Sequence, residues 1–300
     1  MRFRDRSCPV CRDNGNGRVF FESNYDKSLL NEYAFSARKG PEFMHYRIIE
    51  CPVCDLLYAS PAPFLEDISQ EYKKADFDSL EEANYAARTY SKILPKVIPS
   101  LPDLDGAMDI GTGNGAFLEC MLDAGFSNVV GVEPSFSPVQ AAKKEIKPLI
   151  RVCMFSPHDY KPESFSLITC FQTLEHVDAP LSLCRSIYSL LKKGGVVLFV
   201  THNCRTLFAR ILGEKWPIFD IEHLQLFSPQ SLKFMLENAS FEDTLIASCA
   251  NTYPLGYWVK LTPFRDIIKE RVSCIFKRIG ILKVPLPMFV GNIVTIAYKN

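Results

Sequence analysis

The sequence lacks an excess of charge of either sign and lacks long apolar runs. It has 34 basic and 34 acidic side chains, whereas a dedicated nucleic-acid-binding protein usually shows a basic excess, so no nucleic-acid partner is expected. No uninterrupted apolar run reaches 18 residues, so no transmembrane helix is expected. Residues 1–6 contain three arginines but are not followed by an apolar segment, so we expect no secretory signal and a cytoplasmic protein.

The sequence also lacks the low hydrophobicity and the high net charge that are typical of disordered chains. Hydrophobic residues make up 47% of the 300 residues and charged residues 23%, without net charge. A chain with this composition buries enough apolar surface to fold. Its length corresponds to one large domain or two.

The chain has eleven cysteines, an odd number, so a disulfide framework is not expected. Four form two identical pairs, Cys8-Pro-Val-Cys11 and Cys51-Pro-Val-Cys54. A two-residue spacer lets both thiolates of a pair reach one tetrahedral centre, so the two pairs predict a structural Zn²⁺ site without an open coordination position. Unrelated buried thiols are the alternative. A thioredoxin-like redox pair is disfavoured, because neither pair lies in a βαβ pattern.

Composition and proline positions divide the chain into three parts. Residues 1–60 form the predicted zinc-binding module, and residues 61–100 a helical connector or lid. Residues 101–300 form an α/β domain with insertions at about 204–230 and 255–285.

Strand and helix patterns alternate within the third part. Apolar runs predict strands at 106–110, 129–132, 149–155, 165–171 and 196–201, with helices at 116–124, 137–147 and 179–191 between them. Continuous apolar strands alternating with helices indicate a parallel sheet covered on both faces. Two further strands are predicted at 245–249 and 293–298.

A glycine loop follows the first of these strands. Gly111, Gly113 and Gly115 stand at alternate positions before a helix, an arrangement that allows tight turning and close approach of a nucleotide cofactor. Because Gly111, Gly113 and Ala116 also satisfy the dinucleotide fingerprint, an NAD-dependent oxidoreductase is one interpretation.

Two acidic residues favour another cofactor. Asp109 lies two residues before Gly111, inside the strand, where a carboxylate suits a cofactor with a positive charge rather than a pyrophosphate. Glu133 ends the second strand and can accept hydrogen bonds from ribose hydroxyls, which both cofactor classes require.

Four segments resemble, in order, the motifs of class I S-adenosylmethionine-dependent methyltransferases. They are residues 108–115 (MDIGTGNG), 130–133 (VGVE), 171–177 (FQTLEHV) and 190–195 (LLKKGG). Residues 51–58 (CPVCDLLY), Pro61, Tyr72, Trp216 and residues 222–228 (EHLQLFS) resemble a subgroup with an amino-terminal four-cysteine zinc module, which includes sugar and natural-product methyltransferases.

The resemblance implies a Rossmann-like seven-stranded sheet, an S-adenosylmethionine cofactor and a small-molecule acceptor, with methyl transfer to an O or C atom of a sugar, a glycan precursor or a related compound. Implied cofactor-binding residues are Asp109, Gly111, Thr112, Gly113, Gly115, Glu133, Phe155, Ser156, Phe171 and Gln172. The exit of the third strand departs from the family, because it lacks the Gly-Asp that often holds the adenine. A non-catalytic zinc-ribbon scaffold is the third interpretation.

Histidine titrates nearest neutrality and is the natural base for an O or C acceptor. His223 is the leading candidate, with Glu222 beside it to orient it or to bind an acceptor hydroxyl. The pair resembles a Glu-His pair at the matching position of the sugar methyltransferases. His176, which follows Glu175, ranks second and His202 third. The aromatic and aliphatic residues around His223 are expected to enclose a ring-shaped acceptor: Trp216, Phe219, Leu224 and Phe227.

An amphipathic helix is predicted at residues 261–279, with apolar residues at three- and four-residue steps and five basic residues around them. Such a helix is typical of peripheral membrane contact. Packing against its own domain is the favoured interpretation.

Overall fold

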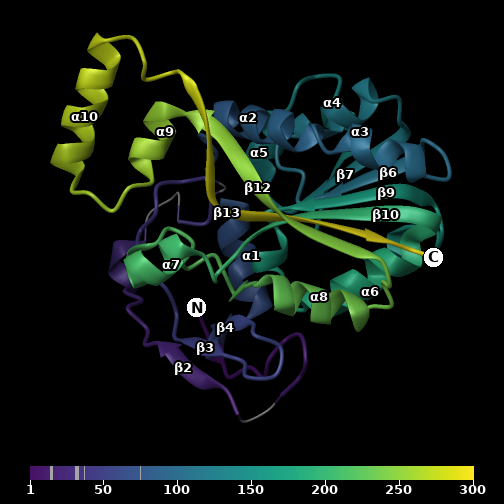
Figure 1. Cartoon of the computed structure of the whole chain (residues 1–300), viewed down its shortest axis with the longest axis horizontal. Helices are drawn as coiled ribbons and strands as arrows, with labels where there is room; N and C mark the ends of the chain where they lie inside the picture. Colours follow the sequence, from purple (N-terminus) through teal and green to yellow (C-terminus); the bar gives the residue numbers. More distant parts are fainter. Residues whose placement is uncertain (14–15, 31–33, 37, 75) are drawn as a thin grey trace.

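The computed structural model describes residues 1–13, 16–30, 34–36, 38–74 and 76–300, and its centre is a seven-stranded sheet (Figure 1). The strand order is β12-β13-β10-β9-β6-β7-β8. β13 pairs antiparallel with both neighbours, and the remaining neighbours pair in parallel. The expected Rossmann-like α/β sheet is therefore confirmed. The strands are β6 Asp105–Ile110, β7 Ser127–Glu133, β8 Ile150–Val152, β9 Phe165–Phe171, β10 Leu191–His202, β12 Thr244–Pro254 and β13 Pro285–Tyr298.

Helices cover both faces of the sheet, and this explains the continuous apolar strands. All seven residues of β9 are buried. Successive side chains of a strand point to opposite faces, so Leu167 packs in the cluster of the α2 and α4 side, whereas Ile168 packs in that of α6 and α8. The helices are α2 Leu80–Ser91, α4 Ala116–Asp123 and α5 Phe136–Gln140 on one face, and α6 Pro180–Leu190 and α8 Pro229–Glu237 on the other (Figure 1).

One helix is shorter than the sequence predicts. The helix expected at 137–147 ends at Gln140, and the chain then turns until Ile146. Between these positions Lys143, Lys144 and Glu145 are exposed. This stretch has too little buried apolar surface to stabilise two further helical turns.

The amino-terminal module shares its sheet with the α/β domain. The four-stranded sheet has the order β11-β4-β3-β2, and β11 Gln225–Leu226 comes from the insertion expected at 204–230. Residues 61–100 contain α1 Leu65–Lys74, α2 and α3 Leu94–Val97. The amino-terminal module is therefore joined to the α/β domain in two ways, through the shared four-stranded sheet and through the helices of residues 61–100. Its other strands are β1 Phe3–Arg4, β2 Arg18–Phe21, β3 Ile48–Glu50, β4 Leu57–Ala59 and β5 Ala62–Pro63.

The insertions carry three further helices, α7 Leu207–Leu212, α9 Leu255–Lys260 and α10 Asp266–Arg278. The helix expected at 261–279 begins only at Asp266, because the turn that contains Pro263 separates α9 from α10. No residue of α10 is buried, and Ile267, Ile268 and Ile275 are exposed, whereas Val272 and Phe276 are half-buried, so only part of its apolar surface packs against its own domain. In the part of the chain that the structure describes, no helix is long and apolar enough to span a bilayer.

Candidate active site

The glycine loop connects β6 to α4 at the carboxyl end of the parallel strands. Gly111, Gly113 and Gly115 have φ values of 76°, 58° and 73°, a region that side chains with a Cβ rarely adopt. A Cβ at Gly111 would lie 2.2 Å from Oγ1 of Thr173, whereas a Cβ at Gly113 would meet nothing within 4 Å. The loop therefore leaves open space at Gly113, as close approach of a cofactor requires.

Glu133, the last residue of β7, holds this loop. Its Oε2 accepts a hydrogen bond from the backbone N–H of Gly113 at 2.9 Å, and its Oε1 accepts one from Ser135 at 2.8 Å. Each carboxylate oxygen keeps a further lone pair for a ribose hydroxyl. Burial raises the pKa of Glu133.

Asp109 is the second buried carboxylate beside the loop. Its Oδ1 accepts a hydrogen bond from Oγ1 of Thr169 at 2.6 Å. Burial raises the pKa of Asp109 to about 6. Two carboxylates and an open glycine loop form a site for a cofactor that carries both hydroxyls and a cationic group, and S-adenosylmethionine fits this description.

A cavity of about 1000 Å³ lies against the loop. Eight of the ten expected cofactor residues line it: Asp109, Gly111, Thr112, Gly113, Glu133, Phe155, Phe171 and Gln172. Gly115 and Ser156 do not line it. A Cβ at Gly115 would meet Cγ2 of Ile146 at 2.5 Å, so this glycine packs against the core. The carbonyl of Ser156 accepts the N–H of Asp159 at 3.3 Å.

Three histidines that are far apart in the sequence line the same cavity. The ring of His223 lies between those of His176 and His202, with centroid distances of 4.9 Å and 5.3 Å. Burial lowers the pKa values of His176 and His223 to about 4 and that of His202 to about 3. All three rings are therefore neutral at physiological pH, and neutral imidazole is the form that accepts a proton.

Hydrogen bonds determine which ring nitrogen carries the proton. Nδ1 of His223 lies 2.7 Å from the carbonyl oxygen of Ile218, which only accepts, so the proton is on Nδ1 and the lone pair on Nε2. Nδ1 of His176 lies 3.1 Å from the carbonyl oxygen of Glu222 and 2.8 Å from the hydroxyl of Tyr72. The Tyr72 hydroxyl can donate as well as accept, so these two contacts hold the ring of His176 without fixing its tautomer.

The carboxylates that neighbour these histidines in sequence are not directed at the rings. Glu222 lies 3.5 Å from Nζ of Lys39, and among the described residues it has no hydrogen bond with the ring of His223. Glu175 is fully buried, and its Oε1 accepts the backbone N–H of His202 at 2.7 Å. The ring of His223 is therefore oriented by the carbonyl of Ile218 and not, as the sequence predicts, by Glu222.

Lys39 organises a buried charge cluster in the lining of the cavity. Its side chain is 5% exposed, lies 2.9 Å from Asp220 and also contacts Glu42 and Glu222. Burial and the neighbouring carboxylates raise the pKa of Glu222. No pattern in the sequence marks Lys39, and the resemblance that includes Tyr72 assigns it no role, because both residues reach the site only through tertiary packing.

The four residues expected to enclose an acceptor are placed differently. Only Trp216 lines the cavity, where it stacks on Phe208 with ring centroids 5.1 Å apart. Phe219, Leu224 and Phe227 are buried in the core, so the expectation that they form the acceptor wall is wrong. The aromatic wall comes instead from distant segments, including Tyr90, Phe117, Phe171, Tyr253, Tyr257 and Trp258.

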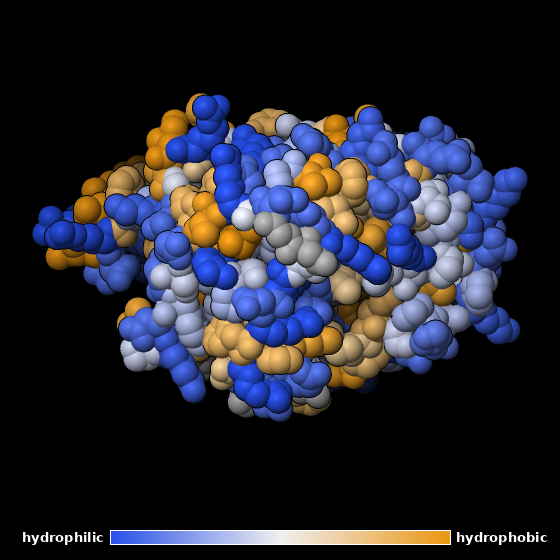
Figure 2. All heavy atoms as spheres, turned by 90° about the horizontal axis from the view of Figure 1, so that it is seen from below, coloured by the Kyte–Doolittle hydropathy of each residue, from blue (hydrophilic) through white to orange (hydrophobic). Residues whose placement is uncertain are grey.

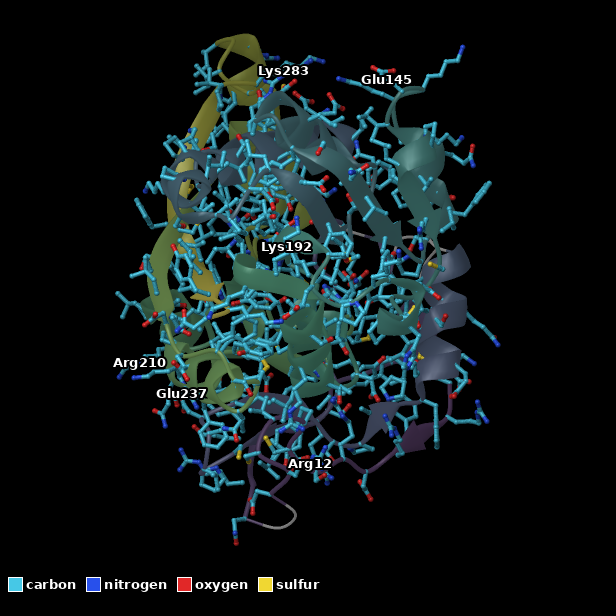
Figure 3. The ribbon with its side chains drawn as sticks, turned by 90° about the vertical axis from the view of Figure 1, so that its right-hand side faces the viewer. Arg12, Glu145, Lys192, Arg210, Glu237 and Lys283 are labelled. Carbon is cyan, nitrogen blue, oxygen red and sulfur yellow. The ribbon has the colours of Figure 1, made fainter. Side chains whose placement is uncertain are left out.

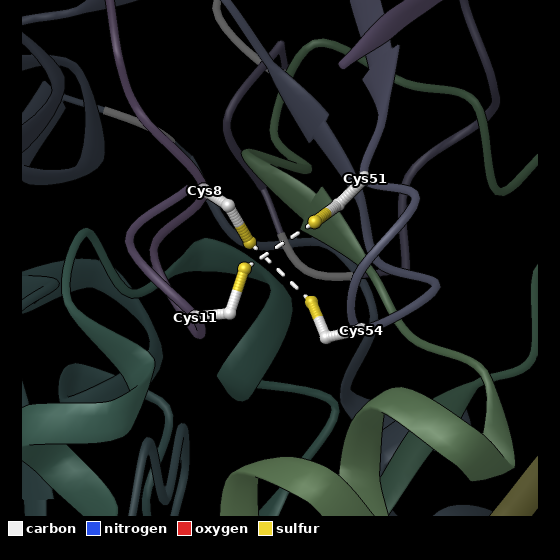
Figure 4. A group of neighbouring side chains, drawn as sticks. All are labelled: Cys8, Cys11, Cys51 and Cys54. Atoms are coloured by element: carbon white, nitrogen blue, oxygen red, sulfur yellow. Dashed lines mark hydrogen bonds between the residues drawn. The ribbon is translucent and has the colours of Figure 1, made fainter. Parts of the chain in front are cut away.

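The four predicted zinc ligands form one cluster (Figure 4). All four Sγ atoms lie within 4.8 Å of one another, and a tetrahedral Zn²⁺ with Zn–S bonds of about 2.3 Å needs sulfurs about 3.8 Å apart. Both pairs have the same turn. The N–H of Arg12 donates to the carbonyl of Cys8 at 2.9 Å, and that of Asp55 donates to Cys51 at 3.0 Å. The donor set and its spacing fit a structural zinc ion.

Comparison with known proteins extends these observations. The ubiquinone biosynthesis O-methyltransferase of Actinobacillus pleuropneumoniae serotype 7 is 36% identical over 115 residues, which cover 35% of this chain and 48% of that protein. The ubiquinone biosynthesis O-methyltransferase of Aliivibrio fischeri MJ11 is 29% identical over 167 residues, covering 50% of this chain and 71% of that protein. The chain thus spans about half the length of the first of these relatives.

The structure is similar to the YcgJ protein of Bacillus subtilis, with a TM-score of 0.51 and 14% identity over 70% of this chain and 98% of that protein. This likeness concerns the fold alone. Residues 82–246, more than half of the chain, match the family described as methyltransferase domain. This match identifies the glycine loop as that of a methyltransferase and not of an NAD-dependent oxidoreductase. With its glycine loop, acidic strand ends and seven-stranded sheet, the chain belongs to the class I S-adenosylmethionine-dependent methyltransferases.

Proposed function

We propose that this chain transfers the methyl group of S-adenosylmethionine to a hydroxyl oxygen of a small acceptor with an apolar or aromatic ring. The observation that carries the proposal is the lone pair on Nε2 of His223, on a ring that lines the cavity beside the glycine loop. The names of the relatives support an oxygen acceptor, because both are O-methyltransferases. The many aromatic side chains of the wall support a ring.

The residues around the loop would hold the cofactor. Glu133 accepts hydrogen bonds from ribose hydroxyls, Asp109 attracts the cationic end, and the backbone at Gly113 allows close approach. Phe155, Phe171 and Gln172 complete the wall. The bound cofactor supplies a methyl group that its sulfonium already activates.

The remaining tasks fall to the protein's own side chains. His223 accepts the proton of the acceptor hydroxyl at Nε2, while the carbonyl of Ile218 keeps the ring in this tautomer. His176, held by Tyr72, is the second candidate for this base. Glu222 lines the cavity next to Lys39 and acts as a positioning residue for the segment that carries His223. The aromatic wall excludes water during the transfer.

We also propose that Cys8, Cys11, Cys51 and Cys54 hold one structural Zn²⁺. The support is the compact four-thiol cluster with two identical turns. Since a closed four-thiolate site has no coordination position for a substrate, the ion holds the module and takes no part in the reaction.

A transfer assay with methyl-labelled cofactor tests the proposed reaction. Catechols and hydroxylated quinols are compared with deoxysugar nucleotides, and the products are examined by mass spectrometry and NMR. We expect an O-methyl product from ring hydroxyls. A product from the sugar nucleotides would move the acceptor to the sugar class, and a C-methyl product would contradict O-transfer. If the protein fails to bind S-adenosylhomocysteine in calorimetry, a non-catalytic scaffold becomes the better account.

A further inference from the structure

Helix α10 belongs to the insertion at about 255–285 and projects from the body of the molecule. It forms the left edge of Figure 1, and Figure 2 shows the same projection with hydrophobic and strongly hydrophilic residues side by side. No α10 residue is buried, and its three isoleucines are exposed, with 57% for Ile267, 43% for Ile268 and 55% for Ile275. Several exposed isoleucines on one helix form an apolar surface of the kind that marks an interaction site.

The helix surface divides into three stripes. Residues at three- and four-residue steps share a face, so Ile268, Arg271, Ile275 and Ile279 lie on one stripe, and all four are exposed. Phe264 precedes this stripe, while Ile267 and Arg278 flank it. Lys269, Val272 and Phe276 are half-buried and face the body, where Lys269 lies 5.9 Å from the ring of Phe43. The acidic Asp266 and Glu270 lie on the third stripe.

The charge of this segment is strongly asymmetric. Seven basic and only two acidic side chains lie between residues 260 and 284, within a chain that has 34 of each sign. Arg271 and Arg278 lie within or beside the exposed apolar stripe, whereas both acidic residues are on another stripe. The outward face of α10 therefore combines isoleucines with arginines and has no carboxylate.

This combination points to one occupant. We propose that α10 docks on the surface of a bilayer that contains anionic phospholipid, with the isoleucines in the acyl boundary and the arginines at the headgroups. A second copy of the chain suits this face less well, because a two-fold interface would gather the arginines of both copies at a contact to which neither face contributes a carboxylate.

The position of the docking face relative to the cavity agrees with this role. Tyr257, Trp258 and Val259 of α9 line the cavity, and so do Leu261 and Pro263 in the turn that leads into α10. The segment that would touch the bilayer thus continues into the wall of the candidate active site. The four-cysteine module lies elsewhere: Lys283, shortly after α10, and Arg12 are at opposite ends of the molecule in Figure 3.

Vesicle sedimentation with the full chain tests the proposal without any methyl transfer. Vesicles of phosphatidylcholine alone are compared with an equimolar mixture of phosphatidylcholine and phosphatidylglycerol. We expect binding to the mixture only, weakened by salt. Replacing both Arg271→Gln and Arg278→Gln should lower the partition coefficient about 25-fold, since one basic side chain near an anionic surface contributes roughly fivefold. Ile268→Ser with Ile275→Ser should lower it as well.

The matched controls are Lys96→Gln with Lys144→Gln, which remove two exposed charges elsewhere, and Leu207→Ser with Ile211→Ser, which polarise the exposed apolar face of α7. These variants should bind vesicles as the wild type does. All α10 variants should keep the melting temperature and the affinity for S-adenosylhomocysteine, which separates this proposal from the proposed reaction. No binding of the wild type, equal binding to both vesicles, or binding that survives the α10 changes would overturn it. A dimer in sedimentation velocity that the same changes dissociate would assign the face to a second copy.

Discussion

Nδ1 of His223 lies 2.7 Å from the carbonyl oxygen of Ile218, five residues earlier in the chain. Because the carbonyl can only accept, this contact keeps the proton on Nδ1 and the lone pair on Nε2. The tautomer of the candidate base is thus a property of one short segment of backbone. Whatever holds residues 218–223 in place also holds the base, and the buried cation Lys39, 2.9 Å from Asp220, is the contact best placed to do so.

Glu133→Gln should weaken binding of S-adenosylhomocysteine. The amide nitrogen cannot accept the N–H of Gly113 or Ser135, so one hydrogen bond to the loop is lost together with the negative charge. We expect a loss of affinity of about 5- to 150-fold in calorimetry, corresponding to about 1–3 kcal/mol for charge-assisted hydrogen bonds. Glu145→Gln, an exposed carboxylate, is the control. Unchanged affinity in Glu133→Gln would remove this residue from the cofactor site.

Cofactor affinity should depend on pH through Asp109, whose pKa burial raises to about 6. Only the ionised carboxylate attracts a cationic group, and ionisation is complete above this pKa and lost below it. Affinity for S-adenosylhomocysteine should therefore fall as pH decreases through about 6, by roughly tenfold per pH unit below that value. Asp109→Asn should bind weakly at all pH values with most of this dependence gone. A wild-type affinity that stays constant across this range would contradict the assignment.

Lys39→Met should destabilise the fold strongly. The change leaves Glu42, Asp220 and Glu222 without their shared cation, and breaking a buried ion pair on one side costs about 3–5 kcal/mol. Urea unfolding measures the effect. Adding Asp220→Asn and Glu222→Gln should recover part of the loss, because the uncompensated charges are then removed. Lys144→Met, at an exposed position, is the control. Equal stabilities of Lys39→Met and Lys144→Met would show that the cluster is not structural.

Purified protein should contain one zinc per chain, measured by plasma mass spectrometry. Cys51→Ser with Cys54→Ser should abolish it, whereas Cys274→Ser, an exposed thiol outside the cluster, should not. Because β11 pairs with β4, a chelator should increase hydrogen exchange in both strands and leave the fully buried β9 protected. Zinc that persists in the double variant would contradict the site.

The sequence patterns that succeeded are local. Continuous apolar runs predict strands such as β9, which has the predicted bounds. A parallel strand buried on both faces is apolar at successive positions, so it can be recognised without knowing which strands it pairs with. The glycine loop and the paired cysteines likewise combine residues that are close in the chain and act together.

The contacts that sequence reasoning missed are long-range. Lys39 of the module meets Asp220, and Tyr72 of α1 meets His176, only after these segments pack on the α/β domain. Glu222 and His223 are neighbours in sequence, but their side chains point to different partners. The amphipathic pattern at α10 specifies an apolar face, and no feature of that pattern says whether protein covers it.

The most direct test of the account is the turnover of His223→Asn with the acceptor that the transfer assay identifies. Asparagine removes the basic Nε2 at a position that does not contact the glycine loop. Turnover should fall by about 10²- to 10⁴-fold, the usual contribution of a general base, while calorimetry shows unchanged affinity for S-adenosylhomocysteine. His176→Asn, measured in parallel, should have the smaller effect. Near-normal turnover of His223→Asn with loss of turnover in His176→Asn would contradict the account and assign the base to the loop after β9.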